Sequence, residues 1–438
     1  MEWTIRPARC LHGRVQVPGD KSIAHRALLL AALAEGASEL KGLPAGADVG
    51  ATLAAVRRLG VEAVQTEPAG LAIKIVGGGL RGLRAPTSPL DCGNSGTTMR
   101  LLAGVLAGQP FRATLTGDRS LRRRPMHRIV EPLRAMGADV RMSSGGTAPL
   151  QIAGRLQPLR AIVHRPQVAS AQVKSCVLLA GLYADGVTQV DEPLPSRDHS
   201  ERLLAAMGAC LAVEERGVGQ LVAIQPQSRL SPLAGELPGD LSSAAYWLVA
   251  ATLCPGSHLT LPQVGLNPTR TAVIDLLRSW GASIETCPGP DWYGEPTGTL
   301  GVRGTADRLR GGTIAAEQVP ALIDELPVLA ALGPLTEAGV EIRGAAELRV
   351  KESDRIASMA AALRCLGAEV DEFPDGLAVA ASASLRGGTI RAAGDHRIAL
   401  AMAAVGVAAA GPVVIEGAEA ASVSYPGFGA ALDRVAER

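Results

Sequence analysis

Aromatic residues, paired cysteines and long apolar runs are all scarce in this chain of 438 residues. The longest apolar run, 398–411, is shorter than the roughly 20 residues that a membrane-spanning helix needs. The opening MEWTIRPARC contains no apolar stretch, so we expect neither a secretory leader nor a membrane anchor. The seven cysteines never occur as CxxC, and their number is odd. This usage fits neither a disulfide framework nor a zinc site, and it predicts a reducing cytoplasm.

The chain also lacks an excess of either charge, because it has 43 Lys and Arg residues and 42 Asp and Glu residues. A net charge of +1 argues against proteins that hold nucleic acid or a membrane surface through bulk positive charge. Apolar residues make up 47% of the chain, which predicts a well-buried core rather than disorder. With 51 glycines and few rings, that core must be built from closely packed Ala, Leu and Val.

The sequence repeats itself at two scales. Pro18–Ala24 (PGDKSIA) returns as Pro238–Ala244 (PGDLSSA), about half a chain length later. A shorter phrase, an apolar run ending in Gly-(Val/Ala) and followed by a strand-like stretch, recurs about every sixth of the chain. Its glycines are Gly60, Gly137, Gly208, Gly281 and Gly367. Each phrase predicts an amphipathic helix that ends at a left-handed glycine and leads into a strand, and 427–437 would supply a sixth such helix.

A second phrase, an Ala/Leu-rich helix that follows small polar residues, alternates with the first. It opens near Asp20, Asn94, Ser170, Asp240, Asp324 and Asp395. Because these helices are apolar on nearly every side, we expect them to be fully buried. The sequence therefore predicts an α/β protein of six repeated units, three per domain, with parallel buried helices inside. The predicted domains are 1–19 with 241–438, and 20–240, joined by a two-stranded hinge near 19–21 and 238–241.

The starts of the buried helices carry cations that a core does not need. These are Lys21, Arg26, Arg100, Lys174 and Arg397. A helix N-terminus has free N–H groups and a partial positive charge, so cations there are disfavoured unless something negative offsets them. Simple N-capping explains Asp240, Ser242 and Ser243, but it does not explain the cations.

More cations open the amphipathic helices, at 119–128, 196–199 and 349–355. Such charge runs are also typical of a solvated helix face. If the units pack in parallel, however, all these starts gather at one end of each domain and form a cleft for a small polyanion. The sequence has no phosphate-binding GxxxxGK[ST] loop, no GxGxxG after a strand and no HExxH. General acid–base chemistry on phosphorylated metabolites therefore remains.

Seven segments, in order, resemble the 5-enolpyruvylshikimate-3-phosphate synthase family. They are PGDKSIAHRALLLAALAEG (18–36), CGNSGTTMRLLAG (92–104), TGDRSLRRRPM (116–126), SAQVKSCVLLAGL (170–182), DELPVLA (324–330), LRVKESDRI (348–356) and DHRIALAMA (395–403). The resemblance implies transfer of the enolpyruvyl group of phosphoenolpyruvate to the 5-hydroxyl of shikimate 3-phosphate, with release of phosphate. It also implies a shikimate-pathway enzyme that works as a cytoplasmic monomer, without metal or organic cofactor, and that is a target of glyphosate.

The resemblance also assigns residues by role. Asp324 resembles the base at the 5-hydroxyl, Glu352 the acid at the methylene carbon, and Lys21 a group that touches both substrates. The residues that resemble shikimate 3-phosphate ligands are Lys21, Ser22, Arg26, Ser170, Gln172, Ser196, Arg197, Asp324 and Lys351. Those that resemble phosphoenolpyruvate ligands are Lys21, Asn94, Gly96, Arg124, Gln172, Arg355 and Arg397.

The sequence departs from the family pattern at two places. Some members have Lys where this chain has Val423, and SAQ stands where others have SSQ, with Ala171 in the middle. We expect Arg197 and Lys174 to compensate for the lost phosphate contacts.

Three rival interpretations remain open at this point. The related transferase acting on UDP-N-acetylglucosamine uses a loop cysteine, whereas Asp118–Met126 contains none. A six-repeat DNA clamp would place its cations along solvated helices rather than at helix starts. A sugar-phosphate binder without catalysis would not need the pair Asp324 and Glu352.

Overall fold

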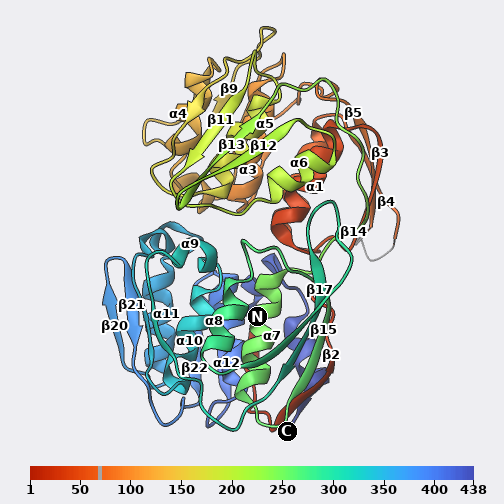
Figure 1. The fold of residues 1–438 in the computed structure, drawn as a ribbon. Coiled ribbons are helices and arrows are strands. Elements are labelled where there is room, and N and C mark those ends of the chain that lie inside the picture. Colours follow the sequence, from red (N-terminus) through yellow and green to blue (C-terminus); the bar gives the residue numbers. More distant parts are fainter. Residues whose placement is uncertain (68–71) are drawn as a thin grey trace. The chain divides into compact units, whose positions relative to one another are not determined.

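A computed structural model of the chain describes residues 1–67 and 72–438, which divide into two compact units (Figure 1). The first unit consists of Met1–Pro18, Pro238–Pro290 and Pro296–Arg438, and the second of Gly19–Leu237 and Asp291–Glu295. Each unit has its own hydrophobic core. None of the helices in these residues combines the length and the apolar character that a membrane crossing needs.

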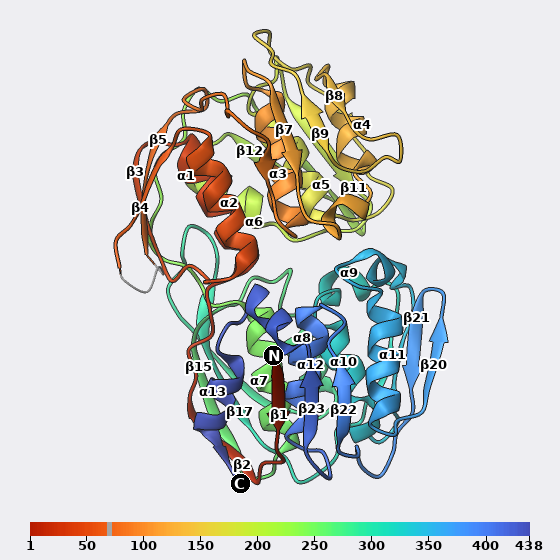
Figure 2. The ribbon, with the colours of Figure 1, turned by 180° about the vertical axis from the view of Figure 1, so that it is seen from behind.

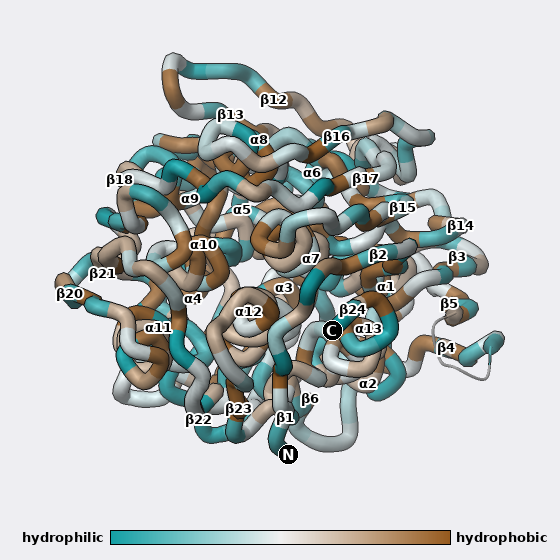
Figure 3. The backbone as a smooth tube through the Cα atoms, turned by 90° about the horizontal axis from the view of Figure 1, so that it is seen from below, coloured by the Kyte–Doolittle hydropathy of each residue, from teal (hydrophilic) through white to brown (hydrophobic). Residues whose placement is uncertain are grey.

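Three helices are buried at the centre of each unit, as the sequence predicts. They are α1 (Lys21–Leu33), α3 (Gly96–Ala107) and α5 (Ala171–Gly181) in the second unit, and α7 (Leu241–Leu253), α10 (Leu326–Leu332) and α12 (His396–Gly406) in the first. Every residue of α12 is buried, and Figure 3 shows this helix along its axis. Small residues allow the close packing: a Cβ on Gly104 in α3 would lie 2.2 Å from the carbonyl oxygen of Cys176 in α5. Close packing of the buried helices therefore accounts for both the scarcity of aromatic residues and the abundance of glycine.

Most buried helices begin at a polar side chain that caps them. In the described residues, Asp20, Ser95, Ser170, Asp240 and Asp395 each accept a hydrogen bond from a backbone N–H in the first turn. The capping role predicted for Asp240 is thus confirmed. In the same part of the chain, the start of α10 lacks such a cap, which leaves the carboxylate of Asp324 available for other contacts.

Amphipathic helices alternate with the buried ones along the chain. They are α2 (Ala47–Arg58), α4 (His127–Ala135), α6 (His199–Ala206), α8 (Ala272–Ser279), α11 (Arg355–Cys365) and α13 (Phe428–Val435). The first five end at the predicted glycines, whose φ angles lie between 83° and 107°. In each case the residue after the glycine donates its N–H to the carbonyl five residues back, as Ala209 does to Leu204. This is the Schellman C-cap, so the predicted left-handed glycines are confirmed.

A pair of glycine substitutions tests this local chemistry. Gly208 has φ +92° and open space around its missing Cβ, so Gly208→Ala should cost about 1–2 kcal/mol of stability through backbone strain alone. Gly50 also has open space but lies inside α2, where alanine is the better helix former, so Gly50→Ala should gain about 0.5–1 kcal/mol. Denaturant midpoints of the two variants should therefore shift in opposite directions. Shifts of the same sign would contradict the assignment.

The described strands of the second unit form three sheets of one design. In each, two neighbouring strands are parallel and the next two pairings are antiparallel. The orders are β14 (Ala234–Glu236), β3 (Glu35–Lys41), β5 (Ile73–Gly78), β4 (Glu62–Gln65); β6 (Leu90–Asp91), β7 (Ala113–Thr116), β9 (Leu150–Ile152), β8 (Val140–Arg141); and β10 (Val163–His164), β11 (Thr188–Glu192), β13 (Gly219–Ile224), β12 (Leu211–Arg216).

The first unit repeats this design with two changes at its edges. Its orders are β18 (Gly312–Ile314), β19 (Val340–Ile342), β21 (Gly376–Val379), β20 (Val370–Phe373); β16 (Ser283–Pro288), β17 (Thr297–Arg303), β15 (His258–Gly265), β2 (Cys10–Arg14), β24 (Ala436–Glu437); and β1 (Glu2–Ile5), β23 (Val413–Glu416), β22 (Gly388–Arg391). The N-terminal β1 completes the last sheet by pairing with β23 (Figure 2). The predicted α/β fold of six repeated units is therefore confirmed.

One short segment leaves the first unit between β16 and β17 and packs with the second. This segment is Asp291–Glu295. Trp292 joins the core of the second unit, and its indole N–H donates to the carbonyl of Ala234 at 3.0 Å. The carboxylate of Glu295 lies 2.7 Å from Nδ1 of His199, and both side chains are buried. The chain therefore passes between the units at this loop as well as near residues 18–19 and 237–238.

Candidate active site

In the first unit the starts of the three buried helices meet in a network of buried charges. Arg270 donates to the hydroxyl of Ser242 at 2.7 Å, and it lies 3.4 Å from Asp240 and 3.7 Å from Glu325. Ser242 in turn donates to Glu325. The sequence suggested that Ser242 is a simple cap. The structure shows instead that it connects α7 with α10 through its hydroxyl group. Because Arg270 and Glu325 are both almost fully buried, this network holds the helix starts together.

Asp324 lies beside two arginines at the same end of the unit. Its Oδ1 lies 3.2 Å from a terminal nitrogen of Arg397 and 3.7 Å from one of Arg355. Arg397 also donates to the backbone carbonyl of Asp324 at 2.7 Å. Burial lowers the pKa of Arg397, but the Asp324 carboxylate and the other acidic groups nearby together outweigh it and raise the pKa. The side chain of Asp324 keeps 19% exposure, so the carboxylate is both positioned and accessible.

Arg355 joins Asp324 to two further carboxylates. It donates to Asp395 at 2.8 Å and to Glu352 at 2.5 Å. Burial opposes the charge of Arg355, yet Asp395 and Glu352 raise its pKa above the ordinary value. Burial also acts on the neighbouring Lys351 and lowers its pKa, against the pull of Asp324. The structure thus brings together the predicted residues Asp324, Lys351, Glu352, Arg355 and Arg397.

In the second unit, the start of α3 gathers a second set of predicted residues. The amide of Asn94 donates to Asp118 at 2.6 Å and accepts from Arg124, which is buried. Gly96 is the first residue of α3, and a Cβ there would lie 3.1 Å from Nη1 of Arg100 and 3.3 Å from Nη1 of Arg124. The missing side chain of Gly96 therefore leaves space directly in front of two guanidinium groups.

Gln172 and Lys21 lie at the starts of the two other buried helices of this unit. The amide oxygen of Gln172 accepts from Arg100, and its nitrogen donates to Thr97 at 2.9 Å. Nζ of Lys21 forms an ion pair with Asp48 in the first turn of α2, at 3.2 Å. Gln172 thus connects α3 with α5, and Lys21 is oriented by a carboxylate that the sequence analysis did not single out.

The buried guanidinium of Arg26 lies near two of the remaining predicted residues of this unit, Ser22 and Arg197. Arg26 donates to the hydroxyls of Ser200 and Ser175 and to the carbonyl of Ser22. Burial lowers the pKa of Arg26 to about 10, and the nearby charge of Arg197 acts in the same direction. A bound anion would relieve this cost.

The structure corrects our expectation for Lys174. This residue is fully buried and forms ion pairs with Glu192 and Glu201, so it does not replace a phosphate ligand. The charge at the start of α5 is balanced by carboxylates of the protein itself. Ser196 also faces inward, because its hydroxyl donates its single hydrogen to Glu192 at 2.5 Å. Sequence reasoning missed Glu192, which ends the strand β11, and Glu201, which lies in the first turn of α6 just after the segment 196–199.

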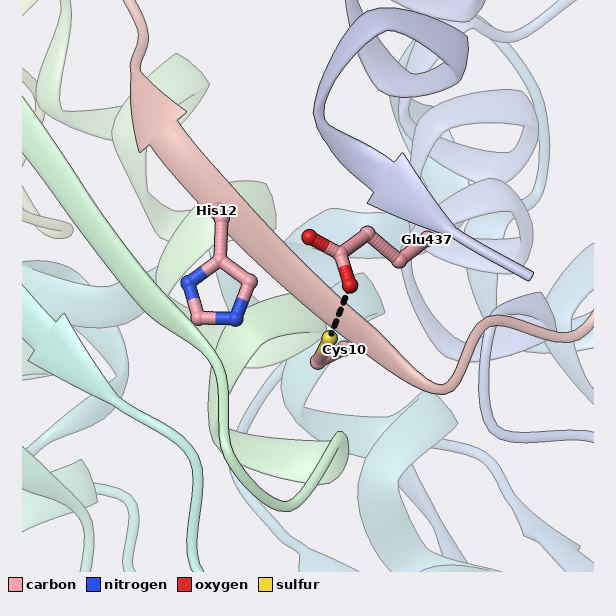
Figure 4. Close-up of side chains that lie close together, drawn as sticks. All are labelled: Cys10, His12 and Glu437. Carbon is pink, nitrogen blue, oxygen red and sulfur yellow. Dashed lines mark hydrogen bonds between the residues drawn. The ribbon is translucent and has the colours of Figure 1, made fainter.

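A cysteine, a histidine and a glutamate meet in the first unit, although the sequence shows no such cluster. Cys10 lies opposite Glu437 in the antiparallel pair β2–β24, and His12 follows on the same face of β2 (Figure 4). Strand pairing accounts for this proximity. The thiol of Cys10 donates to Glu437 at 3.4 Å, and desolvation together with this carboxylate raises the pKa of Cys10. Exposed groups of this kind are common without a metal ion, so we assign no metal to the cluster.

Comparisons with known proteins decide the family. The protein-family model described as EPSP synthase (3-phosphoshikimate 1-carboxyvinyltransferase) matches residues 5–432. Proteins named 3-phosphoshikimate 1-carboxyvinyltransferase from Acidithiobacillus ferrooxidans and a Synechococcus species are 51% and 49% identical. The alignments cover 97% and 99% of this chain and 96% of each relative. The chain belongs to the EPSP synthase family.

Solved structures of the EPSP synthase fold agree with this membership. EPSP synthase from Acinetobacter baumannii superposes with a TM-score of 0.86 at 40% identity, over 99% of this chain and 98% of that one. The enolpyruvyl transferase NikO from Streptomyces tendae reaches 0.74 at 17% identity, over 99% and 96%, which shows a shared fold alone.

Family membership establishes the reaction class. The chain is a transferase of the shikimate pathway that moves the enolpyruvyl group of phosphoenolpyruvate to shikimate 3-phosphate and releases phosphate. The main interpretation of the sequence is thereby confirmed. The rival interpretations, a transferase for UDP-N-acetylglucosamine, a DNA clamp and a binder without catalysis, find no support among these relatives.

Proposed function

We propose that Asp324 and Glu352 divide the proton transfers of this reaction. Asp324 removes the proton of the 5-hydroxyl while Glu352 protonates C3 of phosphoenolpyruvate, and the new C–O bond gives a tetrahedral intermediate. Loss of the C3 proton then expels phosphate and restores the double bond. The observation that carries this proposal is the position of Asp324: it is held by two arginines at a helix start that it does not cap, and it keeps partial exposure. Two carboxylates in different electrostatic environments can serve as base and acid.

The arginines supply the anion sites that the substrates need. Arg355 and Arg397 in the first unit, and Arg124 with Asn94 and Gly96 in the second, would bind the carboxylate and phosphate of phosphoenolpyruvate. Guanidinium groups suit this task because they bind both groups in bidentate fashion. Lys21 would contact both substrates, and Gln172 would lie against the shikimate ring.

The phosphate and hydroxyls of shikimate 3-phosphate would meet a second set of residues. Ser22, Arg26, Ser170, Ser196, Arg197 and Lys351 form this set. Support comes from the buried Arg26, whose charge is only partly compensated, and from the proximity of Arg197. The inward hydroxyl of Ser196 would have to leave Glu192 before it could donate to a phosphate, so a backbone or indirect role suits Ser196 better.

Phosphate release tests the function directly. The protein mixed with both substrates should release inorganic phosphate at a steady rate, whereas either substrate alone should give none above background. UDP-N-acetylglucosamine in place of shikimate 3-phosphate serves as the control for the rival transferase. Release with the nucleotide sugar but not with shikimate 3-phosphate would contradict the proposal.

The assigned residues lie on both units, so we propose that substrate binding draws the units together. An anion that binds cations of both units would stabilise the arrangement in which it contacts them all, and would shift the population toward that arrangement. The hinge is expected near 19–21 and 238–241. Small-angle scattering should therefore show a smaller radius of gyration when shikimate 3-phosphate is added. Shikimate without its phosphate is the control and should have little effect, and an unchanged radius at saturating shikimate 3-phosphate would contradict the closure.

We also propose that the enzyme acts as a cytoplasmic monomer, needs neither metal nor organic cofactor, and binds no nucleic acid or membrane. The seven cysteines, which are all free thiols, are the support for a reducing compartment. Sedimentation of the purified protein tests the monomer, and activity in the presence of a chelator tests the independence from metal.

A further inference from the structure

The buried ammonium group of Lys174 lies at the centre of a polar network in the second unit. It contacts a carboxylate oxygen of Glu201 at 2.6 Å, one of Glu192 at 2.8 Å and the carbonyl of Ser196 at 3.1 Å. The contacts with Glu192 and Ser196 are hydrogen bonds and the contact with Glu201 is an ion pair, so the charge of Lys174 is balanced inside the protein. Lys174 therefore acts on other protein groups and not on a ligand.

The carboxylate of Glu192, at the end of β11, is likewise engaged by hydrogen bonds within the protein. Its two oxygens accept from Lys174, from the hydroxyl of Ser196 at 2.5 Å, from the N–H of Ser196 at 3.3 Å and from the side chain of Gln220 at 2.8 Å. Oε2 accepts three of these hydrogen bonds and Oε1 accepts the one from the Ser196 hydroxyl, so both oxygens are engaged. Glu192 and Lys174 together thus bind the N–H, the hydroxyl and the carbonyl of a single residue, Ser196.

We infer that Glu192, itself held by Lys174, is a positioning residue that aims Arg197 at the phosphate of shikimate 3-phosphate. Ser196 directly precedes Arg197, so fixing all three polar groups of Ser196 fixes the backbone from which the Arg197 side chain departs. The inference rests on the proposed role of Arg197 as a ligand of this substrate.

The position of the network supports a role in binding rather than in packing alone. Lys174 lies on α5 one turn after Ser170, and Glu201 belongs to the first turn of α6, which follows Arg197. The network therefore ties the start of α5 to the segment that carries Arg197. An apolar core could join the same helices at lower cost, because burying charges carries a desolvation penalty. What the charges add is a defined orientation for one short segment.

The substitution Glu192→Gln tests the inference with little change in volume. An amide accepts at only one of its two terminal atoms, so the new amide nitrogen would face a donor of Lys174 or Ser196, and Ser196 would shift. We expect the KM for shikimate 3-phosphate to rise about tenfold, while kcat and the KM for phosphoenolpyruvate stay within about twofold. Glu215→Gln, the same change at an exposed position of β12, is the matched control and should alter none of the three constants.

A double-mutant cycle separates positioning from a general loss of structure. If Glu192 acts through Arg197, then Arg197→Ala should raise the KM for shikimate 3-phosphate, and adding Glu192→Gln should raise it no further. Should Glu192→Gln not fold, Gln220→Met removes one support of Glu192 and should show the same selective rise on a smaller scale.

Two results would overturn the inference while leaving the proposed function intact: additive effects in the cycle, or an unchanged KM for shikimate 3-phosphate in a folded Glu192→Gln variant. A wild-type protein that fails to bind shikimate 3-phosphate in calorimetry would instead contradict the proposed function itself.

Discussion

Replacing Asp324 by asparagine is expected to lower turnover by about 10²–10⁴, the usual effect of losing a general acid or base. Asparagine preserves the volume and the hydrogen-bonding oxygen that faces Arg355 and Arg397, so the fold should remain. The carboxylate that we propose as the acceptor of the hydroxyl proton is lost. Steady-state kinetics at saturating substrates measure the effect, with circular dichroism as the check on folding.

Glu352→Gln should cause a loss of similar size, because its carboxyl group would no longer protonate C3. The matched control for the charge change is Asp307→Asn, at an exposed position in the same unit, which should leave turnover unchanged. Near-full activity in both folded variants, Asp324→Asn and Glu352→Gln, would show that the proton transfers are carried by other groups.

The second large effect is expected at Gly96, where one methyl group should weaken inhibition by glyphosate about 10–200-fold. The family resemblance places this inhibitor in the phosphoenolpyruvate site. A Cβ on Gly96 would lie 3.1 Å and 3.3 Å from the guanidinium nitrogens of Arg100 and Arg124. It would therefore occupy space beside Arg124, which we propose as a ligand of phosphoenolpyruvate. The longer inhibitor should suffer more than the substrate, whose KM we expect to rise several-fold.

Inhibition curves at one fixed concentration of phosphoenolpyruvate measure this difference. Gly50→Ala serves as the control, because it adds the same methyl group in the same unit but in open space. Overlapping curves for wild type and Gly96→Ala would show that Gly96 does not line the site. Because Val423 stands where some relatives have lysine, the direction of the change is predicted rather than the absolute sensitivity.

Local chemistry made much of the fold predictable from the sequence. A glycine after an apolar helix, as at Gly208 or Gly281, specifies a left-handed C-cap whatever the rest of the chain does, and the structure has this cap at both. The uniformly apolar 398–411 required burial, and α12 is buried throughout. Asp324 was found by a different route, because the sequence marks it as the polar start of a buried helix and the family resemblance gives it the role of base.

Pairings between distant residues could not be predicted in the same way. The pairing of β1 with β23 joins the two ends of the chain, and no local signal announces it. The counterions of Lys174 are a second case. Because Lys174 lies in the first turn of an apolar helix, the sequence showed that its charge needs a counterion. The sequence did not show whether a ligand or the protein supplies that counterion. Glu192 at a strand end and Glu201 inside α6 supply that balance only after folding brings them to α5.

Deuterium in the product tests the addition–elimination mechanism most directly. During addition, as we propose, C3 of phosphoenolpyruvate gains a solvent-derived proton through Glu352 and becomes a methyl group, and elimination then removes one of three hydrogens. When the reaction runs in D₂O, the methylene of the transferred group should therefore carry deuterium, as mass spectrometry or proton NMR would show. Product formed at the normal rate with a methylene free of deuterium would contradict the account, since C3 would then never have been protonated.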